Sequence, residues 1–389
     1  MSPRPIYLDY HATTPVDPRV LADMLPYFSD RFGNPASRQH AWGWDAEKAV
    51  ETARAQVAAL INAAPGEIIF TSGASESNNL ALKGLCETRR ERGRHVITVA
   101  TEHKSVLDSC KRLGACGYDV TVLGVRSDGL LDLDALRAAM TAETILVSVM
   151  AANNEIGTLQ PLDAIGAIAH ERGALLHTDA AQAAGKVPID VRAMNIDLLS
   201  LTAHKFYGPK GSGALFVAKS KPRVALAPQI DGGGHEHGFR SGTLNVPGIV
   251  GLGRAAEICR LEMAAESARL RGLRDRLLDG LRGRLDGVVV NGTLDHRLPH
   301  NLHVTFEDVE GEALLMAIGD LAVSTGSACS SGSQAPSHVL QAIGAVRDGG
   351  GASIRFGLGR NTTAEEIEHA IDRVATVVTS LRSTVARSR

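Results

Sequence analysis

Short apolar runs alternate with stretches of helical spacing through the first half of the chain. Seven runs rich in Val, Ile and Leu predict buried strands at residues 67–70, 95–100, 119–123, 145–150, 174–177, 198–201 and 214–217. The intervening stretches predict helices at 45–61, 75–90, 104–113 and 161–171. This alternation predicts an α/β fold with a mainly parallel sheet, in which ligands bind beyond the carboxyl ends of the strands.

A different pattern follows the glycine-rich segment 231–235. The sequence there predicts a long Arg- and Leu-rich helix, two strands and a final helix, over about 249–285, 288–291, 302–306 and 363–381. Thr362 or Thr363 is the expected N-cap of the final helix, because Glu365 and Glu366 follow in its first turn. The long helix would bridge to a smaller domain.

Charge and composition exclude several classes of protein. The 389 residues include 41 basic and 43 acidic side chains, a formal net charge of −2, and no run of five like charges. The electrostatic footprint of a nucleic-acid-binding protein is therefore missing. The first ten residues contain no apolar signal segment, so we expect a cytoplasmic protein.

One long stretch, 321–346, contains no Asp, Glu, Lys or Arg. It is rich in Ser, Gly and Gln and is therefore too polar to span a membrane, so we expect a polar loop. The five cysteines form no CxxC pair and their number is odd, which fits neither a disulfide framework nor a four-ligand zinc site. Each cysteine must therefore be interpreted separately.

A lysine stands just beyond the predicted strand 198–201. Lys205 follows His204 and precedes a glycine-rich turn. Most lysines are solvated surface charges, but an apolar strand would deliver this one into the ligand crevice, where desolvation lowers the amine pKa and favours Schiff-base chemistry. The chain has only nine lysines, and Lys210, in the turn, is the nearest rival for this role.

Other strand ends carry side chains that suit pyridoxal phosphate. The turn 71–77 would meet an anion with backbone N–H groups and the Ser75 hydroxyl, although most such turns only cap helices. Asp179 and Gln182 follow strand 174–177, where a carboxylate could hold the pyridinium proton; a helix cap is the alternative of equal weight for Asp179. A neutral His103 could stack on the ring or move protons, or be a hydrogen-bonded core histidine.

Taken together, the motifs resemble those of the cysteine desulfurases, pyridoxal-phosphate enzymes of the class-V aminotransferase type. The resemblance runs in order from residue 7 to about 363 and is carried by the segments 7–10, 12–19, 32–38, 71–77, 101–104, 153–157, 177–182, 204–211, 232–236, 240–243, 327–330, 353–355 and 358–360. It implies fold type I, with a mainly parallel seven-stranded sheet and a smaller α+β C-terminal domain. The large cofactor-binding domain would span 15–250, and the small domain would combine 1–14 with 251–389.

The resemblance also implies how the cofactor is held. Lys205 would bind pyridoxal 5'-phosphate covalently, Asp179 would pair with the pyridine nitrogen, Gln182 would touch the phenolic oxygen, and His103 would lie over the ring. The remaining cofactor-binding residues would be Ala74, Ser75, Asn154, Thr202, His204 and Thr243. In the family, a threonine at the position of Thr243 reaches the phosphate of the neighbouring subunit, which implies a homodimer with shared sites.

Substrate binding and sulfur chemistry follow from the same resemblance. Asn154 and Arg355 would hold the carboxylate of L-cysteine, since a guanidinium offers it a planar, two-pronged partner. Cys329 lies in a serine-rich loop at about 321–337, which gives its thiol reach and exposure, and His103 is the candidate for activating it. Its thiolate would take the substrate sulfur as a persulfide and release alanine.

The acceptor of that sulfur would be an iron–sulfur scaffold or another protein. The persulfide of Cys329 could serve as a transient iron–sulfur ligand, the only metal role that the sequence suggests. The long loop resembles the housekeeping type of the family, but the chain stops soon after the last predicted helix, without the tail that housekeeping members use to dock the scaffold, which leaves docking open. Ser75 stands where Thr is usual and keeps the hydroxyl.

Three alternatives remain at this point. A selenocysteine lyase or an aminotransferase would share the fold, but an aminotransferase needs no thiol. A silent binding or assembly subunit would need neither Lys205 nor Cys329. A cysteine peptidase pairing Cys329 with a histidine would leave the lysine and the phosphate cradle without a purpose.

Overall fold

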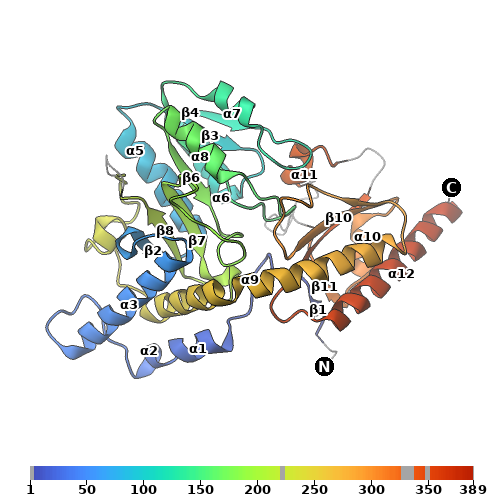
Figure 1. Cartoon of the computed structure of the whole chain (residues 1–389), viewed down its shortest axis with the longest axis horizontal. Coiled ribbons are helices and arrows are strands. Elements are labelled where there is room, and N and C mark those ends of the chain that lie inside the picture. Colours follow the sequence, from blue (N-terminus) through green and yellow to red (C-terminus); the bar gives the residue numbers. More distant parts are fainter. Residues whose placement is uncertain (1–3, 220–223, 326–336, 347–350, 389) are drawn as a thin grey trace.

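The central feature of the computed structural model is a seven-stranded sheet (Figure 1). The structure describes residues 4–219, 224–325, 337–346 and 351–388, with side chains to 384. The strands, in spatial order, are β2 (Ile68–Thr71), β8 (Gly213–Val217), β7 (Leu198–Thr202), β6 (Leu175–Asp179), β5 (Thr144–Ser148), β3 (His95–Val99) and β4 (Asp119–Leu123). Only β8 runs antiparallel to its neighbours. The predicted mainly parallel sheet of seven strands is therefore confirmed.

Both faces of this sheet are buried, and consecutive strand residues alternate between them. In β2, Ile68 and Phe70 belong to the apolar cluster that includes helices α3, α8 and the first half of α9, whereas Ile69 belongs to the cluster on the other face. The helices around the sheet are α3 (Ala41–Leu60), α4 (Ala74–Asn79), α5 (Leu85–Arg89), α6 (Lys104–Ala115), α7 (Leu133–Ala139), α8 (Leu162–Glu171) and α9 (Val246–Arg282).

The predicted helix 75–90 has a different structure. It is divided by a π-helical turn, Leu80–Gly84, between α4 and α5. The helix predicted over 249–285 begins and ends three residues earlier. Two short helices, α1 (Pro18–Met24) and α2 (Pro26–Ser29), precede α3 and were not predicted.

A second, smaller sheet has its own core. It contains β12 (Gly351–Gly357), β10 (Asn301–Glu307) and β9 (Val288–Val290), all antiparallel, and packs its apolar side against the second half of α9 and against α12 (Ala364–Ser388). Thr363 caps α12, because its hydroxyl accepts from the Glu366 N–H while the Glu366 carboxylate accepts from the Thr363 N–H. This confirms one of the two predicted caps.

Two features of the smaller unit differ from the sequence predictions. Strand β12 was not predicted, although Ala352, Ile354 and Phe356 alternate with Ser353 and Arg355 as in a half-buried strand, because the run is short and bounded by glycines. The stretch 321–346 is not a continuous loop: it begins with β11 (Leu321–Ala322), which pairs in parallel with β1 (Ile6–Tyr7), and contains α11 (His338–Ala342). Another short helix, α10 (Gly311–Ala317), lies between β10 and β11.

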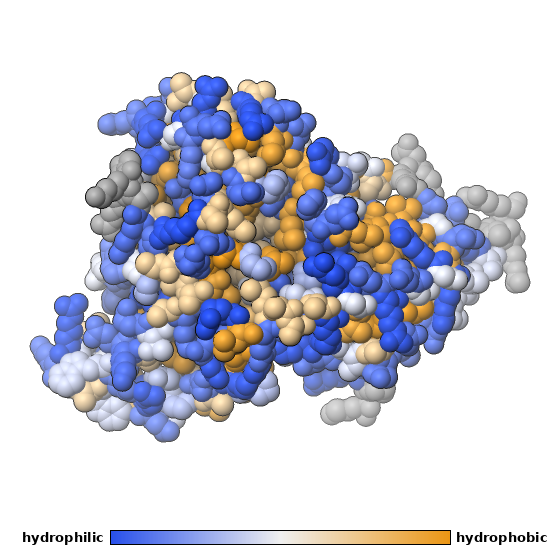
Figure 2. Space-filling model, in the orientation of Figure 1, coloured by the Kyte–Doolittle hydropathy of each residue, from blue (hydrophilic) through white to orange (hydrophobic). Residues whose placement is uncertain are grey.

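Hydrophilic residues cover most of the molecular face in Figure 2, with apolar residues gathered in smaller areas between them. Of the helices in the described part of the chain, none is long and apolar enough to cross a bilayer.

A buried ion pair fixes the glycine-rich segment against the main sheet. Arg54 of α3 donates from both terminal nitrogens to the Glu236 carboxylate, at 2.8 and 2.9 Å, and Phe70 of β2 donates its N–H to the same carboxylate. The side chains of Arg54 and Glu236 are 6% and 1% exposed. Glu236 and His237 both adopt positive φ angles (49° and 58°), which the ion pair helps to hold.

The substitution Glu236→Ala is expected to lower the free energy of unfolding by about 3 kcal/mol, because Arg54 would stay buried with only the exposed Glu51 carboxylate and the Ile68 carbonyl oxygen as partners. Urea unfolding measures this change. Glu368→Ala is the matched control: it removes a half-exposed pair with Arg276 and should cost less than about 1 kcal/mol. Equal losses in the two variants would contradict the anchoring role.

Candidate active site

A cavity of about 600 Å³ opens at the carboxyl ends of the parallel strands, a size usual for small-molecule sites. Ten of the twelve predicted site residues line it: Ala74, Ser75, His103, Asn154, Asp179, Gln182, Thr202, His204, Lys205 and Arg355. They come from segments that follow five different strands and from β12. The cavity is therefore built from segments far apart in the sequence, as expected for an open α/β sheet.

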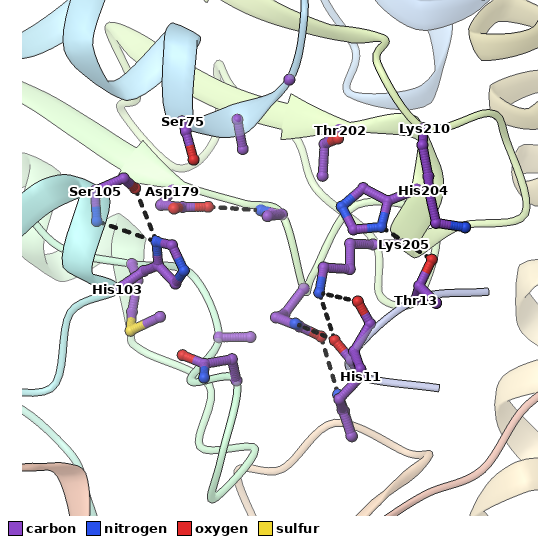
Figure 3. Close-up of a pocket in the computed structure, with 18 of the residues that line it drawn as sticks. His11, Thr13, Ser75, His103, Ser105, Asp179, Thr202, His204, Lys205 and Lys210 are labelled. Atoms are coloured by element: carbon purple, nitrogen blue, oxygen red, sulfur yellow. Dashed lines mark hydrogen bonds between the residues drawn. The ribbon is translucent and has the colours of Figure 1, made fainter. Parts of the chain in front are cut away.

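Lys205 ends a short 3-10 turn that directly follows β7. Its ammonium group donates to the backbone carbonyl oxygens of His11, at 2.5 Å, and Ala12, at 2.8 Å. In Figure 3, Lys205 and His204 lie on one side of the cavity, with Asp179 and His103 on the other. The amine thus faces a space bounded by a carboxylate and an imidazole. Lys210, its rival, also lines the cavity but is exposed.

A chain of hydrogen bonds joins Asp179 to His103. Asn78 donates from its amide nitrogen to Asp179 Oδ2, at 2.8 Å, and to the Ser105 hydroxyl, at 2.9 Å. His103 Nδ1 accepts from the Ser105 N–H at 3.2 Å and lies 2.9 Å from the Ser105 hydroxyl. Because Nδ1 is an acceptor, the neutral imidazole carries its proton at Nε2. His103 is also the N-cap of α6.

Asp179 also binds the local backbone: its Oδ1 accepts a hydrogen bond from the Ala181 N–H at 2.9 Å. The carboxylate is only 5% exposed and is held by both of these donors. No helix lies between β6 and β7 in the described residues, so the helix-cap alternative for Asp179 is wrong; its side chain caps only a turn and lines the cavity.

An anion would fit the end of the cavity where α4 begins. Ser75 and Thr202 line this end with hydroxyl groups, and His204 contributes an imidazole whose Nδ1 lies 3.1 Å from the Thr13 hydroxyl. A Cβ at Gly213 would lie 2.5 Å from the Gly73 Cα, so only glycine allows β8 and this turn to approach so closely. Burial, Lys205 and Lys210 lower the pKa of His204 to about 4, so it is neutral at pH 7.

These donors match the parts of pyridoxal phosphate. Hydroxyls and the first N–H groups of α4 suit a phosphate, and Asp179 suits a protonated ring nitrogen. The amine of Lys205 lies across the cavity from Asp179, beside His204 (Figure 3), and could be linked to the aldehyde of the cofactor. The residues present therefore fit this cofactor.

Arg355 enters the cavity from the small sheet. Its Nη1 donates to the Asn154 carbonyl oxygen and its Nη2 to Asp9 Oδ1, both at 2.8 Å. The side chain is 3% exposed. Among the described residues, Asp9 and Asn154 use one N–H of each terminal nitrogen, so the other N–H of each can meet a carboxylate.

The other two predicted site residues have different outcomes. Thr243 does not line the cavity and is exposed in the single chain. Cys329 lies outside the described residues. His338 of α11 contacts the Glu102 carbonyl oxygen at 3.0 Å, next to the segment that carries His103. Within the described ranges, no three His, Cys, Asp or Glu side chains gather into a metal site.

Several cavity residues were missed by the sequence reasoning, notably His11, Ala12 and Thr13 of the N-terminal segment, and Ser105 and Met150. The N-terminal residues occur in or beside quoted motifs, but no strand or helix pattern there indicates where they lie. For Ser105, the one signal in the sequence is its position two residues after the site candidate His103.

The strand that ends at Asp179 contains a buried histidine whose protonation makes the folding stability depend on pH. His177 of β6 lies 2.8 Å from the Ser148 hydroxyl and 3.1 Å from that of Ser200. Burial lowers the pKa of His177 to about 4. Since the unfolded chain takes up this proton near pH 6.5, folding stability is lost as the pH falls from 6.5 towards 4.

Between about pH 7.5 and about pH 5, this one group is expected to remove about 2 kcal/mol of stability. Urea unfolding of the wild type and of His177→Asn at both pH values measures the effect. The variant should lose about 2 kcal/mol less than the wild type on acidification. Identical losses would show that His177 does not titrate in this way.

The comparisons with known proteins agree with this geometry. Residues 6–369 match the family model described as aminotransferase class-V. A curated cysteine desulfurase IscS from Anaeromyxobacter sp. (strain Fw109-5) is 58% identical over 97% of this chain and 93% of its own length. A cysteine desulfurase IscS from Methylococcus capsulatus is 56% identical with the same coverage.

Solved structures give the same result. A NifS-like protein superposes with a TM-score of 0.89 at 38% identity, over 97% of this chain and all of the other. The protein SspA, solved in complex with cysteine, superposes with a TM-score of 0.79 at 40% identity, over 91% and 98% of the two chains. The chain therefore belongs to the pyridoxal-phosphate-dependent class-V aminotransferase family and, within it, to the cysteine desulfurases.

Proposed function

We propose that this protein removes sulfur from L-cysteine, releasing L-alanine and keeping the sulfur as a persulfide on Cys329. The observation that carries the proposal is the placement of the Lys205 amine in a cavity bounded by Asp179, His103 and the hydroxyls at the start of α4. The similarity to SspA, solved with bound cysteine, supports the choice of substrate.

Different residues would bind different chemical groups of the cofactor. Ala74, Ser75, Thr202 and His204 would bind the phosphate, Asp179 would keep a proton on the ring nitrogen, and Gln182 would contact the phenolic oxygen. When bound, pyridoxal phosphate draws electrons away from the α-carbon of the substrate. The Lys205 amine, released when substrate binds, would take the α-proton.

Substrate orientation would depend on Arg355. Its Asp9 and Asn154 partners fix the guanidinium from one side, so the remaining N–H groups can meet the substrate carboxylate. We propose that the Asn154 side chain, which lines the same cavity, contacts that carboxylate as well.

The sulfur step would use the thiolate of Cys329. A new S–S bond forms to the substrate sulfur, the Cβ–S bond breaks, and its electron pair stays with the three-carbon fragment, which takes up protons to become L-alanine. We propose that His103, whose neutral form carries a proton at Nε2, donates that proton in the cavity and takes one back at the same nitrogen afterwards.

A homodimer is part of this proposal. Six large apolar side chains are between 46% and 66% exposed around α1, α2 and the start of α3: Leu21, Leu25, Phe28, Phe32, Trp42 and Trp44. Exposed apolar area of this extent is typical of protein interfaces. Thr243, exposed and outside the cavity of its own chain, would reach the cofactor phosphate of the partner.

The fate of the sulfur follows the same proposal. Cys329 would pass the persulfide sulfur to an iron–sulfur scaffold or another acceptor protein, and its persulfide would be the transient iron–sulfur ligand. The domain boundaries and the cytoplasmic location stay predictions.

The substitution Lys205→Ala is expected to abolish both the covalent cofactor linkage and alanine release, because the other lysine that lines the described cavity, Lys210, is exposed and lies in the turn beyond Lys205. Borohydride reduction followed by mass analysis of the labelled peptide measures the linkage. Lys210→Ala is the comparison, and it should keep the borohydride-fixed label on Lys205. A label found on Lys210 in the wild type would overturn the assignment.

The substitution Cys329→Ser is expected to keep the coloured cofactor but to form no protein persulfide, because a hydroxyl cannot take the substrate sulfur. Trapping with a thiol-alkylating reagent and mass spectrometry detects the persulfide. Cys116→Ser, at the exposed end of α6, is the matched control and should behave as wild type. Normal sulfide production by the Cys329→Ser protein would refute the proposed nucleophile.

A further inference from the structure

We propose that His11 is a positioning residue that sets the direction of the Gln182 amide and so presents one N–H of that amide to the bound cofactor. This inference rests on the proposed function and adds a relay of directed hydrogen bonds that begins at Arg297, outside the cavity.

The direction of the relay is set by a buried guanidinium. Arg297 is 3% exposed and donates to the carbonyl oxygens of Thr293 and Asn291 and to the side-chain oxygen of Asn301, at 2.8 Å for the last. Burial lowers the pKa of Arg297 to about 9, so at neutral pH it is still charged and can only donate. The Asn301 side-chain oxygen must therefore face Arg297.

The NH₂ group of the Asn301 side chain therefore points away from Arg297. It donates to the Glu155 carbonyl oxygen at 2.9 Å and to His11 Nε2 at 3.0 Å. Gly157 makes this contact possible: it has φ +72°, and a Cβ there would lie 2.4 Å from the Asn301 side-chain oxygen. His11 Nε2 is thus an acceptor.

His11 is 1% exposed, and burial together with the nearby Arg355 and Lys205 lowers its pKa well below the usual range, so the imidazole is neutral. With Nε2 accepting, the single proton must be at Nδ1. Nδ1 lies 2.9 Å from Gln182 Oε1, and the Gln182 amide nitrogen donates to the His11 carbonyl oxygen at 3.0 Å.

These two bonds determine the amide orientation of Gln182. A flipped amide would place NH₂ against the Nδ1 proton and oxygen against the His11 carbonyl, which loses both bonds. In the observed orientation, one N–H is used by the His11 carbonyl and the second is left for the cavity that Gln182 lines. The amide is therefore fixed as a donor before any ligand binds.

The same backbone carbonyl accepts from the Lys205 ammonium at 2.5 Å. This contact belongs to the main chain, so a substitution of the His11 side chain leaves it available. Effects of such a substitution then report on Gln182 rather than on Lys205. Figure 3 shows His11 beneath Lys205, with its dashed contacts to neighbouring groups.

The orientation of the Gln182 amide should affect the pKa of the nitrogen that links Lys205 to the cofactor. An N–H donated to the phenolic oxygen stabilises the negative charge there and weakens the ability of that oxygen to hold a proton on the linkage nitrogen. Loss of the donor should therefore raise the pH midpoint of the visible absorbance change of the holoenzyme. A charge-assisted hydrogen bond predicts a rise of about one pH unit.

The experiment compares pH titrations of visible absorbance for the holoenzyme and its variants. His11→Asn keeps a donor near the Nδ1 position and should retain the wild-type midpoint, whereas His11→Gln and His11→Ala lack that donor and should raise the midpoint by up to about one unit, because only the His11 carbonyl then directs the Gln182 amide. His300→Ala is the control: it removes the ring stacked on His11, at 4.4 Å between centroids, but no bond to Gln182, and should leave the midpoint unchanged.

Each result bears on the proposal. An unchanged midpoint in His11→Gln, with cofactor bound, would overturn it, as would an equal rise in His300→Ala, which would indicate packing alone. If His11→Ala does not fold, the difference in midpoint between His11→Asn and His11→Gln still tests the proposal. A wild-type protein without borohydride-reducible absorbance would refute the proposed function itself, which is a distinguishable outcome.

Discussion

The burial of the central sheet on both faces is the constraint on which the rest of the structure depends. Consecutive strand residues such as Ile68 and Ile69 enter different apolar clusters, so both faces of the sheet are covered by apolar packing. Polar side chains that belong to function are therefore confined to the strand ends. Because six of the seven strands run in the same direction, their carboxyl ends meet at one edge, and the cavity forms there.

Around this cavity, polar groups are directed by other buried polar groups. Asn78 links the Asp179 carboxylate to Ser105 and so to His103, while Asn301 links Arg297 to His11 and so to Gln182. Within these networks each amide or imidazole has one favourable orientation, because the group behind it can only donate or only accept. In a site of low exposure, such satisfied networks are rigid, since breaking one bond leaves a buried group unpaired.

The cavity is completed by segments that the main sheet does not provide. Arg355 comes from the small sheet and is held by Asp9, whereas His11 and its neighbours come from the N-terminal segment. The glycine-rich segment is attached through the buried pair Arg54–Glu236. Long-range ion pairs and backbone bonds thus bring together residues that are separated by hundreds of positions in the chain.

The sequence by itself determined the main sheet and the strand-end residues. All seven strands, and Lys205, Asp179 and His103 beyond them, could be predicted because β-branched periodicity is local and parallel strands share one edge. The roles of these residues stay proposals. Only the tertiary structure decided that His11, Ala12 and Thr13 line the cavity, that Arg355 lies on a strand, and how Asn301 orients His11. These positions and orientations depend on contacts between distant segments, so they cannot be predicted from local periodicity.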